Sequence, residues 1–185
     1  MKEKSFLNNF SVFNLILIAI ISSLGVATKP IVVPLVHVIT GPLLIPGGAI
    51  AGGFYMFWIV LGAGLVKKRG TGILIGIVQS ILVIATGTMG THGLMSFVSY
   101  TLPGAAVDIV FLFSINKNYN ILHYIFGCMA ANVVGTLIAN ILFFRLPPVT
   151  VVLILSCAAL SGTIGGIIAS SIMSGLDKMN IIIGD

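Results

Sequence analysis

Ionisable and amide side chains are rare in the apolar parts of this sequence, so each is a candidate for a chemical role. Asp108 is the only acid inside a predicted helical span, and it follows Pro103-Gly104, where a helix could bend. Gln79 is expected at a similar depth in the preceding span, so the two side chains are predicted to form a hydrogen bond. Because polar groups in an apolar layer are costly, this pair is either a structural network or a site where Asp108 binds a cation or an amino group.

A second group of polar side chains comes from segments that are predicted to meet at one end of the helices. It offers hydroxyl, amide, imidazole and ammonium groups, which could hold a heterocycle by hydrogen bonds. The group comprises Thr86, Thr88, Thr91, His92, Ser96, Tyr100, Asn140, Arg145, Lys29 and His37. Together these residues predict a ligand pocket, in which Thr88, His92 and Tyr100 are expected to make the main contacts.

Two further features bear on this pocket. Asn132 lies in the middle of an apolar segment and either forms the pocket floor or pairs with another helix. Tyr55 and Trp58, three residues apart, either stack on a flat ligand ring or occupy a lipid-facing or core position. The three histidines lack the i,i+4 spacing of a helical metal site, so neither a metal nor another cofactor is predicted.

The composition indicates what kind of protein must position these groups. Of 185 residues, 58% are apolar and only 7% are charged, and the mean hydropathy is +1.20. Soluble proteins are roughly 25% charged, so this chain cannot cover a water-facing surface. The sequence therefore predicts an all-α, multi-pass membrane protein and excludes a soluble enzyme, a nucleic-acid-binding protein and a disordered linker. The net charge of +5 is assigned to loops, because the largest basic cluster is Lys67-Lys68-Arg69.

Charged residues and glycine-rich turns divide the chain into apolar segments, and a helix of about 20 residues crosses a bilayer. Six spans are predicted in a single membrane domain covering 1–185, at about 10–28, 47–66, 71–88, 93–114, 121–144 and 149–175. Segment 29–46 contains four prolines and is predicted to be a lid or re-entrant loop after the first span. A kinked seventh helix is the alternative for this segment.

The basic residues orient these spans. With six spans and the amino terminus inside, seven basic residues face the cytoplasm, and only Lys29 and Arg145 face outside. Cytoplasmic loops carry an excess of Lys and Arg, so this arrangement is preferred over seven spans. Both termini are therefore predicted to be cytoplasmic, and the polar pocket is predicted to open to the outside.

Small residues repeat every four positions on two of the predicted helices. Ala19, Ser23 and Ala27 share one face of the first span. The last span has a similar stripe at Gly162, Gly166, Ser170 and Ser174. Such faces allow close helix packing, either within the protein or against a partner membrane protein. The partner interpretation is stronger for the first span, because the neighbours of its stripe are large.

The sequence also indicates how active transport, if this protein takes part in it, would be powered. It contains no G-x-x-x-x-G-K-[ST] pattern for binding nucleotide phosphates, so active transport would need a separate ATPase or an ion gradient. An intramembrane enzyme would need a paired nucleophile and base. The spans hold no carboxylate pair, and Ser161 has no histidine at its expected depth.

These features together resemble the substrate-binding S components of energy-coupling factor (ECF) vitamin transporters. The resemblance rests on six spans with both ends inside, a proline-rich segment after the first span, no ATPase sequence, and the Ala19-Ser23-Ala27 stripe. It implies a non-catalytic protein of the prokaryotic plasma membrane that captures a vitamin-like ligand from outside. It also implies that the stripe contacts a membrane-embedded T component, and that two cytoplasmic ATPases power release.

Within that family, residues 41–114 are most similar to the YkoE-type group, which is linked to thiamine or its hydroxymethylpyrimidine precursor. The similarity rests on Gly41-Pro42, an aromatic-rich span, a basic cluster ending at Gly70, Gly87, and Asp108-Ile-Val-Phe-Leu. That group has carboxylates on the third span, where this chain has only Gln79. A deazapurine such as queuosine or a corrinoid stays open as the ligand. The alternative function is a stand-alone small secondary transporter or channel, which would need ionisable residues along a continuous pathway.

Overall fold

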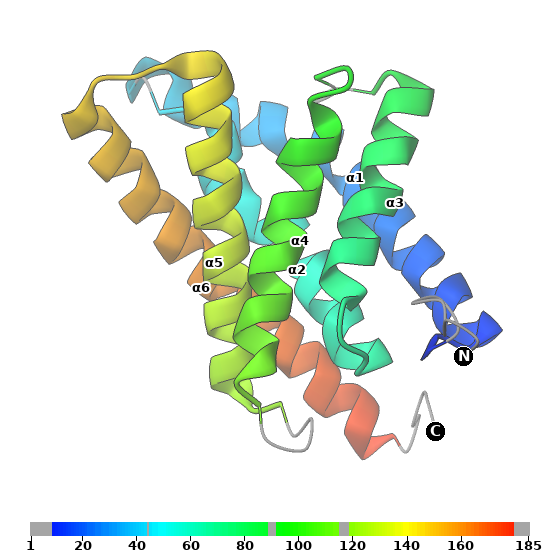
Figure 1. The fold of residues 1–185 in the computed structure, drawn as a ribbon. Coiled ribbons are helices and arrows are strands. Elements are labelled where there is room, and N and C mark those ends of the chain that lie inside the picture. The colour runs from blue at the N-terminus through cyan, green and yellow to red at the C-terminus, as the bar shows by residue number, and fades with distance from the viewer. Residues whose placement is uncertain (1–8, 44, 89–91, 115–118, 180–185) are drawn as a thin grey trace.

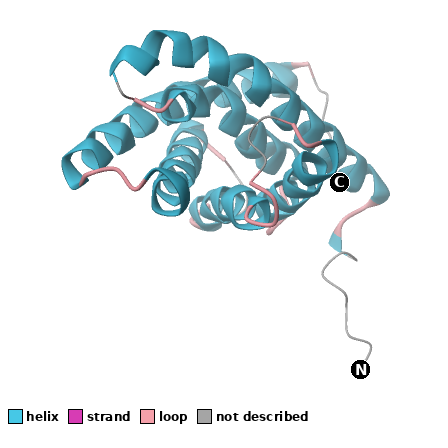
Figure 2. Ribbon diagram, turned by 90° about the horizontal axis from the view of Figure 1, so that it is seen from above, coloured by secondary structure: helices cyan, strands magenta, loops and turns pink. Residues whose placement is uncertain are grey.

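The structure is a computed structural model, and it describes residues 9–43, 45–88, 92–114 and 119–179. Within these residues, six α-helices with short connections form a bundle (Figure 1). The helices are α1 (Val12–Thr40), α2 (Gly47–Val66), α3 (Thr71–Thr86), α4 (Ser96–Leu112), α5 (Ile121–Ala139) and α6 (Pro148–Lys178). A 3-10 turn at Gly41–Leu43 follows α1, and a π-helical turn at Asn140–Phe144 extends α5. The prediction of an all-helical protein is confirmed for the described residues, which are drawn as helices and loops in Figure 2.

Five of the described helices are long and apolar enough to cross a bilayer, namely α1, α2, α4, α5 and α6. Helix α3 is apolar but has 16 residues, about 24 Å of helix against a hydrocarbon core of about 30 Å. It ends where the sequence indicates, because Gly87 takes the left-handed conformation with φ of 60° and caps the helix. The chain is a multi-pass membrane protein, and a sixth crossing by α3 stays a prediction.

The predicted lid or re-entrant loop at 29–46 is wrong for residues 29–40, which continue α1. Pro30 and Pro34 each lack an N–H group, but their fixed φ suits a helix. In an apolar layer a loop would expose all its backbone polar groups, whereas a helix satisfies nearly all of them internally. The cost of two missing hydrogen bonds is smaller than that of an unpaired loop, so α1 continues and the irregular connection begins only after Thr40.

The two ends of the bundle differ in charge. The start of α1, the turn between α2 and α3, and the end of α6 lie at one end (Figure 1). We call this the basic end, because it carries Lys67, Lys68, Arg69 and Lys178. Arg145 lies at the opposite end, after the π-helical turn. This arrangement fits an even number of crossings, while the cytoplasmic location of the basic end stays a prediction from the positive-inside rule.

Helix α2 lies at the centre of the bundle and contacts each of the other five helices. It is 67% buried along its span, and glycine makes this possible. A Cβ atom on Gly53 would overlap the backbone carbonyl of Ser161, and one on Gly52 would overlap the Asn132 side chain. The absence of side chains at these two positions therefore allows α6 and α5 to approach α2 closely.

Two buried polar side chains hold α2 against these neighbours. The Ser161 hydroxyl accepts a hydrogen bond from the Gly53 N–H at 2.9 Å and donates to the Ile50 carbonyl. The Asn132 amide donates to the carbonyls of Ala49 at 2.9 Å and Ala158 at 2.8 Å. Each buried side chain thus joins different helices by hydrogen bonds.

The small-residue stripe of α6 serves internal packing. Gly162 lies against the backbone of Met129, and Gly166 lies against the backbone of Ile125, both on α5. The interpretation of this stripe as internal packing is confirmed at these two glycines. Only the stripe of α1 therefore remains as a candidate for contact with another protein.

Candidate ligand-binding site

A lysine inside the bundle is the centre of the candidate site. Lys29 lies on α1, and its ammonium group donates a hydrogen bond to the Tyr100 hydroxyl of α4 at 2.9 Å. The same nitrogen lies 4.4 Å from the centroid of the Tyr100 ring and 5.3 Å from that of Tyr55 on α2. Both rings lie within the range of a cation–π interaction. Helices α2 and α4 thus place aromatic side chains around one positive charge on α1.

Local hydrogen bonds fix the aromatic residues near Lys29. The Trp58 indole N–H donates to the Thr28 hydroxyl at 3.0 Å, which joins α2 to α1 one residue before the lysine. The Tyr55 hydroxyl donates to the Gly48 carbonyl at 3.0 Å. Because both aromatic residues have fixed orientations, they form a rigid wall. We call Lys29, Tyr55, Trp58 and Tyr100 the Lys29 cluster.

His92 precedes α4 and lies near this cluster. Its ring stacks on Phe143 of the π-helical turn, with centroids 4.1 Å apart, and its backbone N–H donates to the Ser96 hydroxyl at 2.9 Å. Burial lowers the pKa of His92, and the positive charge of Lys29 lowers it further. His92 is thus a neutral imidazole at neutral pH, and its charge is linked to that of Lys29.

The low pKa of His92 predicts a pH dependence of stability. Below its ordinary pKa near 6.5, the unfolded chain binds a proton at this residue more readily than the folded chain does. Stability should therefore fall as the pH drops from 7.5 to 5, and His92→Gln should lose less stability over this range than the wild type. Thermal unfolding in detergent measures the difference. Thr88→Ala, which removes no titratable group, should follow the wild type, and equal losses in wild type and His92→Gln would contradict the prediction.

The structure brings together part of the predicted pocket. Tyr55, Trp58 and Tyr100 belong to the Lys29 cluster, and His92 and Ser96 lie beside it. Thr88 forms a hydrogen bond with Thr86 at 3.2 Å, at the exposed end of α3, and the predicted pocket residue Thr91 lies outside the described residues.

Other predicted pocket residues lie elsewhere. His37 is eight residues beyond Lys29, about 12 Å along α1, and packs against Gly41 and Gly47. Asn140 accepts a hydrogen bond from the Leu146 N–H at 3.0 Å and closes the turn before α6. Asn132 pairs with α2 and α6, as one of its two sequence interpretations predicted.

The predicted hydrogen bond between Asp108 and Gln79 is wrong. Asp108 accepts from the backbone N–H groups of Gly72 at 3.0 Å and Ile73 at 2.8 Å, at the start of α3. Gln79 is seven residues beyond Gly72, about 10 Å farther along the helix, where it packs against Gly25 of α1. The partner of Asp108 is thus a helix N-terminus, whose orphan N–H groups and positive dipole end attract a carboxylate.

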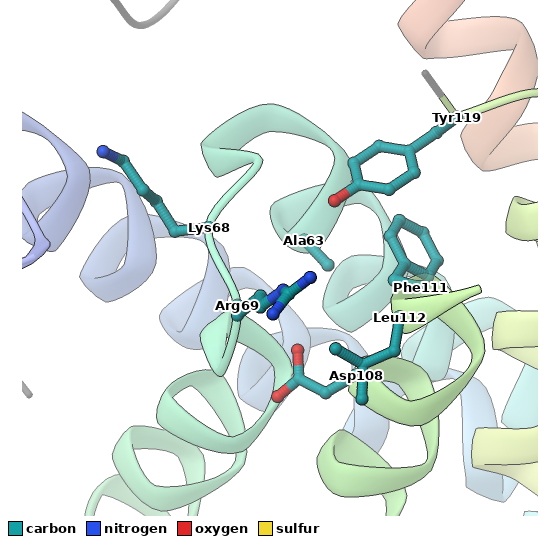
Figure 3. Close-up of a pocket in the computed structure, with 7 residues that line it drawn as sticks. All are labelled: Ala63, Lys68, Arg69, Asp108, Phe111, Leu112 and Tyr119. Carbon is teal, nitrogen blue, oxygen red and sulfur yellow. The ribbon is translucent and has the colours of Figure 1, made fainter. Parts of the chain in front are cut away.

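Asp108 also borders a small pocket at the basic end. The pocket is lined by Ala63, Lys68, Arg69, Asp108, Phe111, Leu112 and Tyr119. Figure 3 shows the Arg69 guanidinium group pointing toward the Asp108 carboxylate, with the Tyr119 hydroxyl facing the same space. Because this carboxylate already binds the start of α3 and faces the Arg69 guanidinium group, the arrangement is suited to holding the turn between α2 and α3.

The importance of Lys29 exceeds what the sequence interpretation gave it. That interpretation included Lys29 among residues facing the outside and expected a loop there. A signal was present, because Ser22, Gly25 and Lys29 follow one another at spacings of three and four. Ser22 and Gly25 are buried, so a helix that continues past Thr28 must turn Lys29 toward the same interior.

The Ala19-Ser23-Ala27 stripe of α1 is exposed on the surface of the bundle. Large apolar side chains beside it, including Ile16, Ile20 and Leu24, are exposed as well. The Ser23 hydroxyl donates to the Ala19 carbonyl at 2.8 Å, which satisfies its hydrogen-bonding group within the helix. The stripe is thus an exposed row of small residues on an apolar surface.

Comparisons with known proteins agree with this architecture. A solved structure described as "Crystal structure of an S-component of ECF transporter" aligns with 94% of this chain and 88% of that chain, with a TM-score of 0.72 and 18% sequence identity. This chain therefore has the fold of that S component. Residues 13–134 match the family described as "ABC-type cobalt transport system, permease component", and the chain belongs to this family. A search of curated proteins finds no significant match.

Proposed function

We propose that this protein is the substrate-binding S component of an ECF-type importer, which captures a small heterocyclic ligand from outside the cell. The observation that carries the proposal is the whole-chain similarity to an S component, which extends over 94% of the sequence. The family description supports a role in an ATP-driven transport system. The Lys29 cluster then provides the ligand site, and the exposed stripe of α1 provides the surface for a T component.

In this proposal the protein binds and releases its ligand but performs no catalysis. Tyr55 and Trp58 supply flat apolar faces, and Lys29, Tyr100 and His92 supply directional polar contacts. Two cytoplasmic ATPases and the T component would supply the energy for release. The site lies within packed helices, so affinity comes from preorganised side chains.

A second part of the proposal concerns which ligand the protein binds. The resemblance to the YkoE-type group favours thiamine or its hydroxymethylpyrimidine precursor, whose flat ring suits stacking on aromatic side chains. The family description names cobalt. The ammonium group of Lys29 would repel a divalent cation at this site, whereas aromatic walls suit an organic ring. We therefore propose an organic ligand.

Two measurements test the function. Mass spectrometry of extracts from the purified protein should identify a retained heterocycle, and purification from native membranes should recover a second membrane protein with two ATPases. Uptake into liposomes that contain this protein alone, driven by an ion gradient, would instead establish the alternative of a stand-alone transporter.

The stripe of α1 gives a separate prediction. Ala19→Phe should reduce recovery of the partner proteins at least about tenfold, because a bulky ring fills the face on which two helices would approach. Ligand binding should persist, because the stripe lies on the outside of the bundle. Ile20→Phe is the matched control, since it exchanges one large exposed side chain for another. Normal recovery of the partners with Ala19→Phe would show that the stripe faces only lipid.

A further inference from the structure

The Lys29 cluster contains a positive charge that this chain does not neutralise within the described residues. The sequence contains four acids. Glu3 and Asp185 lie outside the described residues, Asp108 binds the start of α3, and Asp177 lies near the end of α6 at the basic end. Among the described residues, the ammonium group of Lys29 contacts the Tyr100 hydroxyl and the rings of Tyr100 and Tyr55, which carry no charge. A charge in an apolar layer without a counter-charge is costly, and such residues mark ligand or ion sites.

The geometry leaves the ammonium group with capacity for another partner. A lysine ammonium has three N–H donors, and one of them is directed at the Tyr100 hydroxyl. The rings of Tyr100 and Tyr55 stabilise the charge by cation–π interaction but accept no conventional hydrogen bond through their faces. Trp58 and Tyr55 are held by separate hydrogen bonds to Thr28 and Gly48, so their orientation does not depend on the lysine.

From these observations we propose that the ligand carries an anionic group, a carboxylate or a phosphate, and that the Lys29 ammonium binds it. The inference rests on the proposed function and narrows its ligand class. The aromatic walls hold the ring of the ligand, and the lysine ammonium pairs with the ligand's acidic group. This pairing reduces the cost of burying both charges. His92, neutral at this site, adds a hydrogen bond without adding charge.

This charge preference distinguishes among the candidate ligands. The thiazolium ring of thiamine is positively charged and would meet the like charge of Lys29. A phosphorylated pyrimidine keeps the flat ring and adds the required anion. The site therefore favours an acidic heterocycle over a cationic one, in agreement with the absence of a carboxylate on α3.

Matched pairs of compounds that differ in charge test the inference on the wild-type protein. The pairs are nicotinate with nicotinamide, pyridoxine phosphate with pyridoxine, riboflavin phosphate with riboflavin, and hydroxymethylpyrimidine phosphate with hydroxymethylpyrimidine. Thermal shift and titration calorimetry in detergent measure the affinities. In one or more of the pairs, the acidic member should bind about tenfold more tightly than its neutral partner, or tighter still. Tighter binding of neutral members, or no binding of any acidic member, would overturn the inference.

Two variants locate the effect at Lys29. Lys29→Met keeps the length of the side chain and should weaken the acidic ligand at least about tenfold, whereas Lys29→Arg should keep most of the affinity. Unfolding temperatures without ligand show whether each variant folds. Equal affinity of Lys29→Met and wild type for the acidic compound would place the anion elsewhere and overturn the assignment.

A lipid phosphate is a second possible source of the anion, and one arm of the experiment separates it. Stabilisation by added phosphatidylglycerol that depends on Lys29, with none by the soluble acids, would assign the lysine to a headgroup and overturn the ligand proposal. Recovery of the ATPases with the protein is measured independently. If the ATPases copurify with the protein while a neutral ligand binds best, the proposed S-component function is retained and only the inference of an anionic ligand fails.

Discussion

Replacing Asp108 with alanine is expected to lower the free energy of unfolding by about 2–3 kcal/mol. The carboxylate accepts from two backbone N–H groups at the start of α3, those of Gly72 and Ile73. Helix α3 begins after Gly70, which has no side chain to serve as a cap, so α4 supplies the missing acceptor. The variant leaves two donors unpaired at a helix terminus, which costs their desolvation as well as the lost bonds.

Two controls make this prediction specific. Asp108→Asn keeps one acceptor oxygen and should fall between alanine and the wild type. Asp177→Ala removes an exposed acid from the last turn of α6 and should change stability by less than about 0.5 kcal/mol. The measurement is reversible unfolding in mixed detergent micelles. If Asp108→Ala were as stable as Asp177→Ala but lost ligand affinity, Asp108 would be a ligand contact rather than a cap.

The fold was largely predictable because hydropathy and turn residues report directly on helix ends. Gly70 and Gly87 flank α3 with positive φ, and the span predicted at 121–144 coincides with α5 and its π-helical turn. The error fell on α1, where proline was taken to end the helix. That expectation suits a helix in water, where a loop can bind solvent, but in an apolar layer the backbone has no partner outside the helix.

The site was predicted less well, because the type of a polar residue does not indicate which group will be its hydrogen-bond partner. Asn140 was grouped with the pocket, yet it pairs with the backbone of Leu146. Asn132 was left between a pocket floor and a helix contact, and it pairs with backbone carbonyls of α2 and α6. Lys29 was grouped with the pocket, but on segment 29–46, which was taken as a lid or re-entrant loop. Its inward direction follows only once α1 is known to continue, since the helical phase set by Ser22 and Gly25 then carries it into the bundle.

The contact between α2 and α6 gives the second large prediction. Gly53→Ala is expected to cost about 3 kcal/mol or more, or to prevent folding. The added methyl group would overlap the backbone carbonyl of Ser161, which cannot rotate away as a side chain could. Moving α6 outward would also break the hydrogen bonds between the Ser161 hydroxyl and α2. The loss of packing and of a buried polar contact should therefore occur together.

Gly48→Ala is the matched control in the same helix, because a Cβ atom there meets only the Tyr55 hydroxyl at an ordinary 3.7 Å. Alanine is the better helix former by about 1 kcal/mol, so this variant should be as stable as the wild type or slightly more stable. Unfolding of both variants in mixed micelles, with the yield of monodisperse protein, measures the difference. Equal stability of Gly53→Ala and Gly48→Ala would mean that α6 can move away from α2 at little cost, and that the central helix is not what fixes the bundle.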